Sequence, residues 1–111
     1  MADESLPFEH NGGIWMLNSK QRAYLRGLGN TLEPTLLIGK GGLNDNMLVD
    51  IDRALEAREL VKIKVLNNSM ADPRETSTEI AEKTGAEVVQ VIGGKFILYR
   101  QSVENQTIIL P

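Results

Sequence analysis

The fold of this chain is decided by the stretch PTLLIGKGGLNDNMLVDI, residues 34–51. Its apolar run over 35–38 has the length of a buried strand, and the glycine cluster over 39–42 ends that strand. Asn44 belongs to the residue types that cap helix N-termini, and the apolar residues after it recur at helical spacing. The stretch therefore predicts a strand, a tight glycine turn and a helix that covers a sheet.

The glycine turn is the most informative candidate site in the sequence. Glycines between a strand and a helix permit a tight turn and a close approach of another backbone. The amides of the following helix N-terminus favour an anion, and Lys40 adds a mobile positive charge. The turn matches the pattern GxxG, with which KH domains clamp a single-stranded nucleic-acid backbone. It predicts a phosphate-binding site, although turn geometry alone would also require glycines. Its residues are Gly39, Lys40, Gly41 and Gly42.

A basic helix is predicted before this stretch. Ser19 is the expected N-cap, and leucines follow it at helical spacing. Pro34 ends the helix about two residues before itself. Lys20, Arg22 and Arg26 fall on the other faces of this helix, where they can contribute a positive surface.

A strand, a helix and a hairpin are predicted after the stretch. Apolar residues over 61–65 alternate with Lys62 and Lys64, which indicates a half-buried strand with both lysines on its outer face. Residues 72–84 begin with a cap, a proline and an acid in helix-starting order. Two apolar runs flank the glycines at 93–94, and this pattern is typical of a two-residue hairpin.

The element order α-β-α-β-α-β-β predicts an α/β fold, a small mixed four-stranded sheet packed with helices. Two crossover helices make the first three strands parallel neighbours, and the hairpin makes the fourth strand antiparallel. The strand order itself stays open. We expect one domain over 14–104, a disordered acidic leader over 1–13 and a C-terminal tail over 105–111.

Composition excludes several function classes. The chain has 111 residues, 41% of them hydrophobic, with no cysteine and one histidine. It can bury one core, but it has no thiol chemistry or disulfide scaffold, and its single histidine lies in the leader. We therefore expect no enzyme, metal or cofactor, and we expect the carboxylates on solvated helix faces. Because no signal peptide or membrane-length apolar run is present, we expect a cytoplasmic monomer that does not bind membranes.

The net charge of −3 hides a segregated distribution. The segments over 19–42 and 60–71 are each net positive, whereas 1–18 and 43–59 are net negative. If the two positive segments lie together in space, the domain has a basic face despite its acidic total. If they do not, the charges are ordinary solvated faces.

Residues 17–100 resemble the CRM domain, named for chloroplast RNA splicing and ribosome maturation, whose bacterial stand-alone members are the YhbY-type proteins. The resemblance rests on LNSKQR at 17–22, on the proline before a strand that ends IGKGGL, on ALEARELVK at 54–62, and on the hairpin that ends LYR at 98–100. Many members carry Ala-His where this chain has Gly29-Asn30.

The resemblance implies a KH-related RNA-binding fold similar to the C-terminal domain of bacterial initiation factor three. It also implies that the GxxG loop and neighbouring basic residues contact RNA, and that the protein associates with precursors of the large ribosomal subunit. The partner would then be ribosomal RNA. The candidate RNA-binding residues are Gly39, Lys40, Gly41, Gly42, Lys20, Arg22, Arg26, Lys62 and Lys64.

Two other function classes stay open. The chain could be a small regulatory module that binds a nucleotide or another anionic metabolite at the same helix N-terminus. It could also be a protein-interaction domain whose hairpin edge pairs with a partner strand. The salt dependence of the affinity distinguishes RNA binding from nucleotide binding, because a long RNA releases several counterions on binding whereas a mononucleotide releases few.

Overall fold

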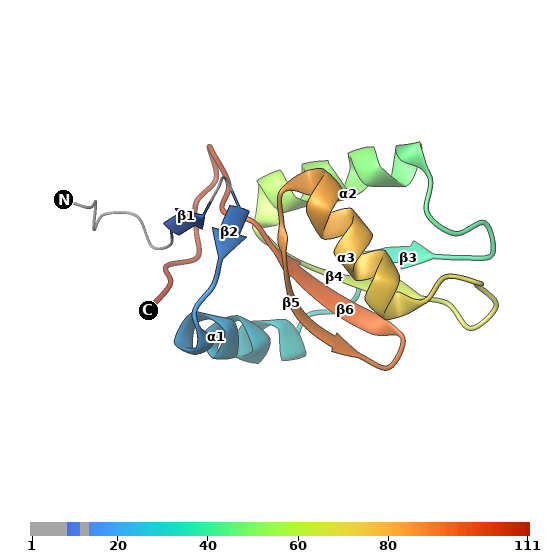
Figure 1. The fold of residues 1–111 in the computed structure, drawn as a ribbon, viewed down its shortest axis with the longest axis horizontal. Helices are drawn as coiled ribbons and strands as arrows, with labels where there is room; N and C mark the ends of the chain where they lie inside the picture. Colours follow the sequence, from blue (N-terminus) through green and yellow to red (C-terminus); the bar gives the residue numbers. More distant parts are fainter. Residues whose placement is uncertain (1–8, 12–13) are drawn as a thin grey trace.

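The computed structural model describes residues 9–11 and 14–111, which form a four-stranded mixed sheet with helices on both faces (Figure 1). A separate two-stranded ribbon lies near the N-terminus. None of the helices in the described ranges is long and apolar enough to cross a membrane. The elements are β1 (Glu9–Asn11), β2 (Ile14–Met16), α1 (Ser19–Asn30), β3 (Leu36–Ile38), α2 (Asp45–Arg58), β4 (Leu60–Val65), α3 (Pro73–Thr84), β5 (Glu87–Ile92) and β6 (Lys95–Tyr99).

The sheet has the strand order β3-β4-β6-β5. The predicted α/β class and mixed four-stranded sheet are confirmed, and β3 and β4 are parallel neighbours. The prediction that the third strand, β5, also lies beside β4 is wrong, because β6 inserts between them and pairs antiparallel with both. β6 is buried on both faces, with Phe96 and Leu98 on one and Ile97 and Tyr99 on the other. A strand that is apolar on both faces is most stable in a central position.

The helix caps follow local sequence signals, with one correction. The N-cap of α1 is Asn18 and not Ser19, since the Asn18 side chain accepts from Gln21 N and the Gln21 side chain accepts from Asn18 N. This reciprocal pair is a capping box, which satisfies two amides at once. The predicted caps Asn44 of α2 and Asp72 of α3 are confirmed.

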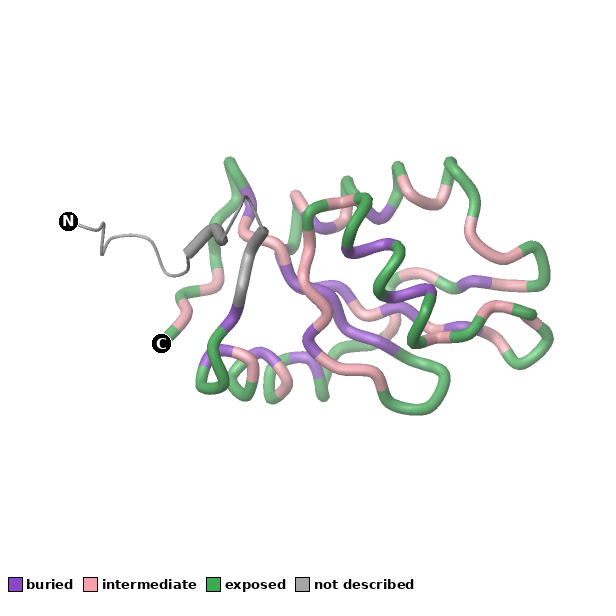
Figure 2. Tube along the Cα trace, in the orientation of Figure 1, coloured by how far each residue is buried: buried purple, intermediate pink, exposed green. Residues whose placement is uncertain are grey.

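Two apolar clusters hold the layers together, and the buried positions follow the central strands (Figure 2). The larger cluster joins the inner sides of β4 and β6 to α2 and α3. The smaller one joins α1, through Leu25, to the opposite sheet face. There, a Cβ added to Gly29 would lie 2.5 Å from Ile97 Cδ1, so glycine lets α1 approach the sheet closely.

Part of the predicted tail over 105–111 packs on the domain. Ile108 and Leu110 contact the smaller cluster. Thr107 N and Ile108 N each donate to Glu59 Oε1 at 2.9 Å. Glu59 is fully buried at the C-cap of α2, so the prediction of solvated carboxylates is wrong for this residue. Its carboxylate is retained in the interior because backbone amides satisfy it.

The predicted leader over 1–13 lies mostly outside the described residues. The part that is described, Glu9–Asn11, is strand β1, which pairs antiparallel with β2. In this ribbon His10 lies opposite Trp15.

Candidate nucleic-acid interface

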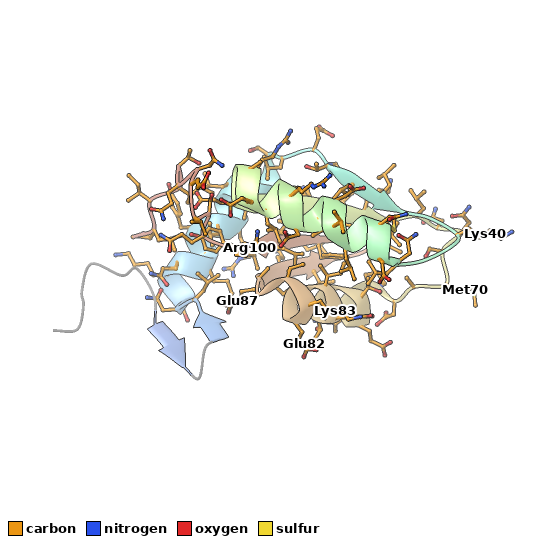
Figure 3. The ribbon with its side chains drawn as sticks, turned by 90° about the horizontal axis from the view of Figure 1, so that it is seen from above. Lys40, Met70, Glu82, Lys83, Glu87 and Arg100 are labelled. Carbon is orange, nitrogen blue, oxygen red and sulfur yellow. The ribbon has the colours of Figure 1, made fainter. Side chains whose placement is uncertain are left out.

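The GKGG turn, residues 39–42, is a hydrogen-bonded turn at the end of β3. Gly42 N donates to Gly39 O at 3.0 Å, which leaves Lys40 and Gly41 at the tip. Gly42 has a φ of 71°, a conformation that glycine adopts without strain. A Cβ placed on Gly41 would have no neighbour within 4 Å, so the tip is open to a ligand. Lys40 is exposed and projects from this end of the molecule (Figure 3).

The tip of the turn is better suited to an anion than the helix N-terminus behind it. Asn44 Oδ1 accepts the hydrogen bond of Met47 N at 2.9 Å, so the first turn of α2 is already capped. Asp45 adds a carboxylate in that turn. Among the described residues, by contrast, the amides of Lys40 and Gly41 donate to no backbone acceptor. Unpaired amides on a turn form an anion-binding concavity together with a nearby cation.

Three segments meet at this end of the sheet. The loop over 66–72 lies beside the turn, because Leu66 N donates to Ile38 O at 2.9 Å. The hairpin turn joins them, because Val65 N donates to Gly94 O at 2.7 Å. We name residues 39–42, 66–72 and 93–94 the open end. Met70 is 93% exposed there, at the same end as Lys40 (Figure 3).

A row of four residues crosses the sheet next to the open end. Strand register pairs Leu37 with Lys64, Lys64 with Lys95, and Lys95 with Ile92. Because neighbouring positions enter the larger core, these four side chains lie on the α1 side. That face is not covered here, since Leu37 is 52% and Ile92 is 59% exposed. Two like charges directly opposite each other repel, so the lysine pair, Lys64 and Lys95, favours an anion between them.

Lys62 lies on the predicted outer face of β4 but has an intramolecular role. Its Nζ donates to Gly29 O and Leu32 O, at 3.2 Å each. These carbonyls belong to the last turn of α1 and the segment after it, where a cation is favourable. Lys62 therefore fixes the end of α1 on the sheet, and a role in RNA contact stays a prediction.

The basic residues of α1 are not brought to the open end as a group. Arg22 forms an ion pair with Glu87 at 2.5 Å and also donates to Val88 O. Glu87 lies where β5 begins, at the opposite end of the sheet. Since α1 has 12 residues and a helix of that length is about 18 Å long, Lys20 is remote from the turn. Lys20 is exposed and Arg26 half-buried.

Comparison with known proteins identifies the family. The sequence model of the CRS1 / YhbY (CRM) domain matches residues 17–100. The chain belongs to this family. A Bacillus subtilis relative, "Probable RNA-binding protein YqeI", is 43% identical over 96 residues that cover 86% of this chain and 100% of the relative. A Haemophilus influenzae "RNA-binding protein" is 36% identical over 88 residues, 79% of this chain and 89% of the relative.

A solved CRM-type structure has the same fold. The solution structure of the hypothetical protein SAV1595 from Staphylococcus aureus matches with a TM-score of 0.73 and 48% identity. The match covers 86% of this chain and 100% of the other. The sheet with helices on both faces is thus the architecture of a CRM domain, as the resemblance implies.

Three residues outside the predicted site line a cavity beside the open end of this CRM domain. Asn30, Gln90 and Lys95 come from α1, β5 and β6, and they line one cavity together with Lys62. Nothing in the local sequence marks Gln90 or Lys95, and Asn30 stands out only as part of the departure from the family's usual Ala-His. Only the pairing of β6 with both β4 and β5 brings them together, and the strand order was the feature that could not be predicted.

Proposed function

We propose that this protein binds RNA mainly through phosphates at the open end and the lysine pair. The observation that carries the proposal is that two candidate phosphate-binding features lie close together. The open tip of the GKGG turn lies at the same end of the sheet as Lys64 and Lys95. None of the ion pairs among the described residues involves these lysines or Lys40. The names of its relatives support the same partner.

The mechanism is backbone recognition without catalysis. The amides of Lys40 and Gly41 bind one phosphate, and the Lys40 ammonium adds charge. The lysine pair binds a neighbouring phosphate across the sheet. Lys20 and Arg26 extend the contact along α1 for a longer RNA, with Lys62 and Arg22 mainly positioning elements. The RNA is ribosomal, in precursors of the large subunit, and this step rests on the family resemblance.

The alternative of a small anionic metabolite at the α2 N-terminus has weaker support. Asn44 already caps that terminus, and Asp45 repels an anion there. A mononucleotide bound at the α2 N-terminus would also not contact the lysine pair. The two functions differ in salt dependence, because each phosphate contact on single-stranded RNA adds about 0.7 to the slope of log affinity against log salt.

Gly41→Asp tests the proposal, because it adds bulk and a negative charge at the open tip. Since a Cβ added at this position would have no neighbour within 4 Å, the fold should survive. RNA affinity, measured by fluorescence anisotropy, should fall more than tenfold. For a short oligonucleotide bound at the open end alone, Gly27→Asp on α1 is the matched control, because Gly27 is also exposed and a Cβ there would have no neighbour within 4 Å. Unchanged affinity in a folded Gly41→Asp variant would refute the proposed site.

The proposed cellular role has its own experiment. A lysate is fractionated on a sucrose gradient, and the protein is located by immunoblot. We expect it with particles of the large subunit and its precursors in the wild type, and at the top of the gradient in Gly41→Asp. Wild-type protein that stays at the top of the gradient would contradict the ribosomal assignment. RNA binding itself would still be tested by the anisotropy assay.

A further inference from the structure

A small cavity lies on the α1 side of the sheet, between the last residue of α1 and the β5–β6 hairpin. Its volume is about 160 Å³. Ligand pockets for whole drug-sized molecules are about 300–1,000 Å³, so this one has room for a single ring system. It borders the open end, because two of its residues flank the hairpin turn. The lining residues are Asn30, Lys62, Gln90, Ile92, Lys95 and Ile97.

One residue that lines this cavity carries a polar atom without a partner. Gln90 Oε1 is buried and accepts no hydrogen bond among the described residues. A buried acceptor without a donor is unfavourable, and native structures almost always satisfy such atoms. Because Gln90 lines the cavity, rotation of its amide toward the cavity would let a ligand with an N–H group supply the missing donor.

The rest of the lining fits a flat, partly polar ring. Ile92 and Ile97 provide apolar walls, against which a ring can be desolvated. The Asn30 side chain offers both a donor and an acceptor. Lys62 and Lys95 place positive charge at the same site, where a negatively charged group attached to the ring would be favoured.

We propose that this cavity takes one unstacked nucleobase of a single-stranded RNA segment, with Gln90 Oε1 accepting a hydrogen bond from the base. The inference rests on the proposed RNA binding and adds the site of base selection to it. Phosphate contacts carry no sequence information, whereas contacts to base edges do. The lysine pair holds the backbone, and the next base along enters the cavity.

The test compares homopolymeric RNAs of uridine, cytidine and adenosine at one salt concentration. The wild type should prefer one of them by about tenfold, which is within the range for a single well-made base contact. Gln90→Met keeps the side-chain length and removes the acceptor. It should reduce the preference to near unity and leave the salt slope unchanged. Gln106→Met, at an exposed position outside the cavity, should keep the wild-type preference.

A second measurement needs no variant. Titration of the wild type with the preferred homopolymer should shift the NMR signals of the Ile92 and Ile97 δ1-methyl groups. The methyl groups of Ile51 and Ile80, in the cluster on the opposite face, should stay in place. If the chemical shifts of the Ile92 and Ile97 methyl groups do not change on titration, the proposal is overturned.

The outcomes separate the two claims. A wild type that binds RNA with no base preference, or a Gln90→Met variant that keeps its preference, overturns base selection at this cavity alone. A wild type that binds none of the RNAs overturns the proposed function as well. Thermal melting of Gln90→Met should show no loss of stability, because the substitution removes an unpaired buried acceptor.

Discussion

The two ends of the sheet use charged residues in opposite ways. At the end where β4 begins and β6 finishes, charges are paired: Arg100 binds Asp52 at 2.6 Å, and Arg22 binds Glu87. At the open end, Lys40, Lys64 and Lys95 form none of the ion pairs found in the described ranges. Basic side chains therefore stabilise the fold at one end, as arginines in ion pairs, and remain available for a ligand at the other, as lysines outside those pairs.

The paired end is organised around the carboxylates of α2. Glu59 accepts from the backbone amides of Ser102, Thr107 and Ile108. Glu56 accepts from Ser102 Oγ at 2.7 Å, and this hydrogen bond, with those from the following amides, lowers the pKa of Glu56 from its ordinary value. Burial and the nearby Glu59 carboxylate raise the pKa of the Tyr99 hydroxyl. These groups fix the C-terminal segment on the domain.

Glu59→Ala should have the largest effect, and that effect should be on stability. The variant truncates a fully buried side chain and leaves three backbone amides of the C-terminal segment without their acceptor. The free energy of unfolding should fall by about 3 kcal/mol or more. Urea denaturation measures it. Glu82→Ala, an exposed carboxylate on α3, is the control and should change stability little. If Glu59→Ala and Glu82→Ala lose the same free energy of unfolding, the carboxylates at the paired end have no special role in stability.

Replacement of the lysine pair should have the next largest effect, on RNA affinity. Lys64→Ala with Lys95→Ala should lower affinity about tenfold or more and reduce the salt slope by about 1.4, or 0.7 for each lost contact. Stability should hold or rise slightly, because two opposed like charges disappear. Anisotropy over a salt series and thermal melting check both expectations.

A matched control removes two positive charges from the other side of the molecule. Arg74 and Lys83 are exposed on α3, which packs on the opposite sheet face. Arg74→Ala with Lys83→Ala changes the net charge by the same amount. If both double variants lose affinity equally, only overall charge matters, and the lysine pair is not a site.

The features predicted from the sequence are those that depend on neighbours along the chain. The GKGG turn, the Asn44 cap and the proline start of α3 follow from adjacent residues, and all are present. The pairing of Lys64 with Lys95 depends on β6 entering the centre of the sheet. That position follows from β6 being buried on both faces. The apolar runs on either side of residues 93–94 predicted a hairpin but not this burial.

Glu59 shows a second limit of local reasoning. It follows Arg58 at the end of an ordinary-looking helix, and its burial depends on amides more than 40 residues further along the chain. Its φ of 69° is the one positive value among the described non-glycine residues. Ordinary helix propensity predicts neither property, because the contacts that stabilise this conformation come from the C-terminal segment.

The smallest expected effect concerns two arginines of α1, which the sequence places together but to which the structure gives different roles. Arg22 and Arg26 share a helix face, being four residues apart, and the family resemblance makes both candidate RNA-binding residues. Arg22→Ala removes the ion pair to Glu87 and the hydrogen bond to Val88 O. Because the pair is partly exposed, the free energy of unfolding should fall by only about 1 kcal/mol. The salt slope of RNA binding should not change.

Arg26→Ala should show the opposite pattern. No ion pair within the described chain holds its guanidinium, so stability should stay near the wild-type value. If α1 extends the RNA contact, the salt slope for a long RNA should fall by about 0.7, while that for a short oligonucleotide bound at the open end should not. Urea denaturation and anisotropy on the two single variants resolve the roles. A reduced salt slope in Arg22→Ala with full stability would return Arg22 to the RNA-binding surface and extend that surface to the paired end of the sheet.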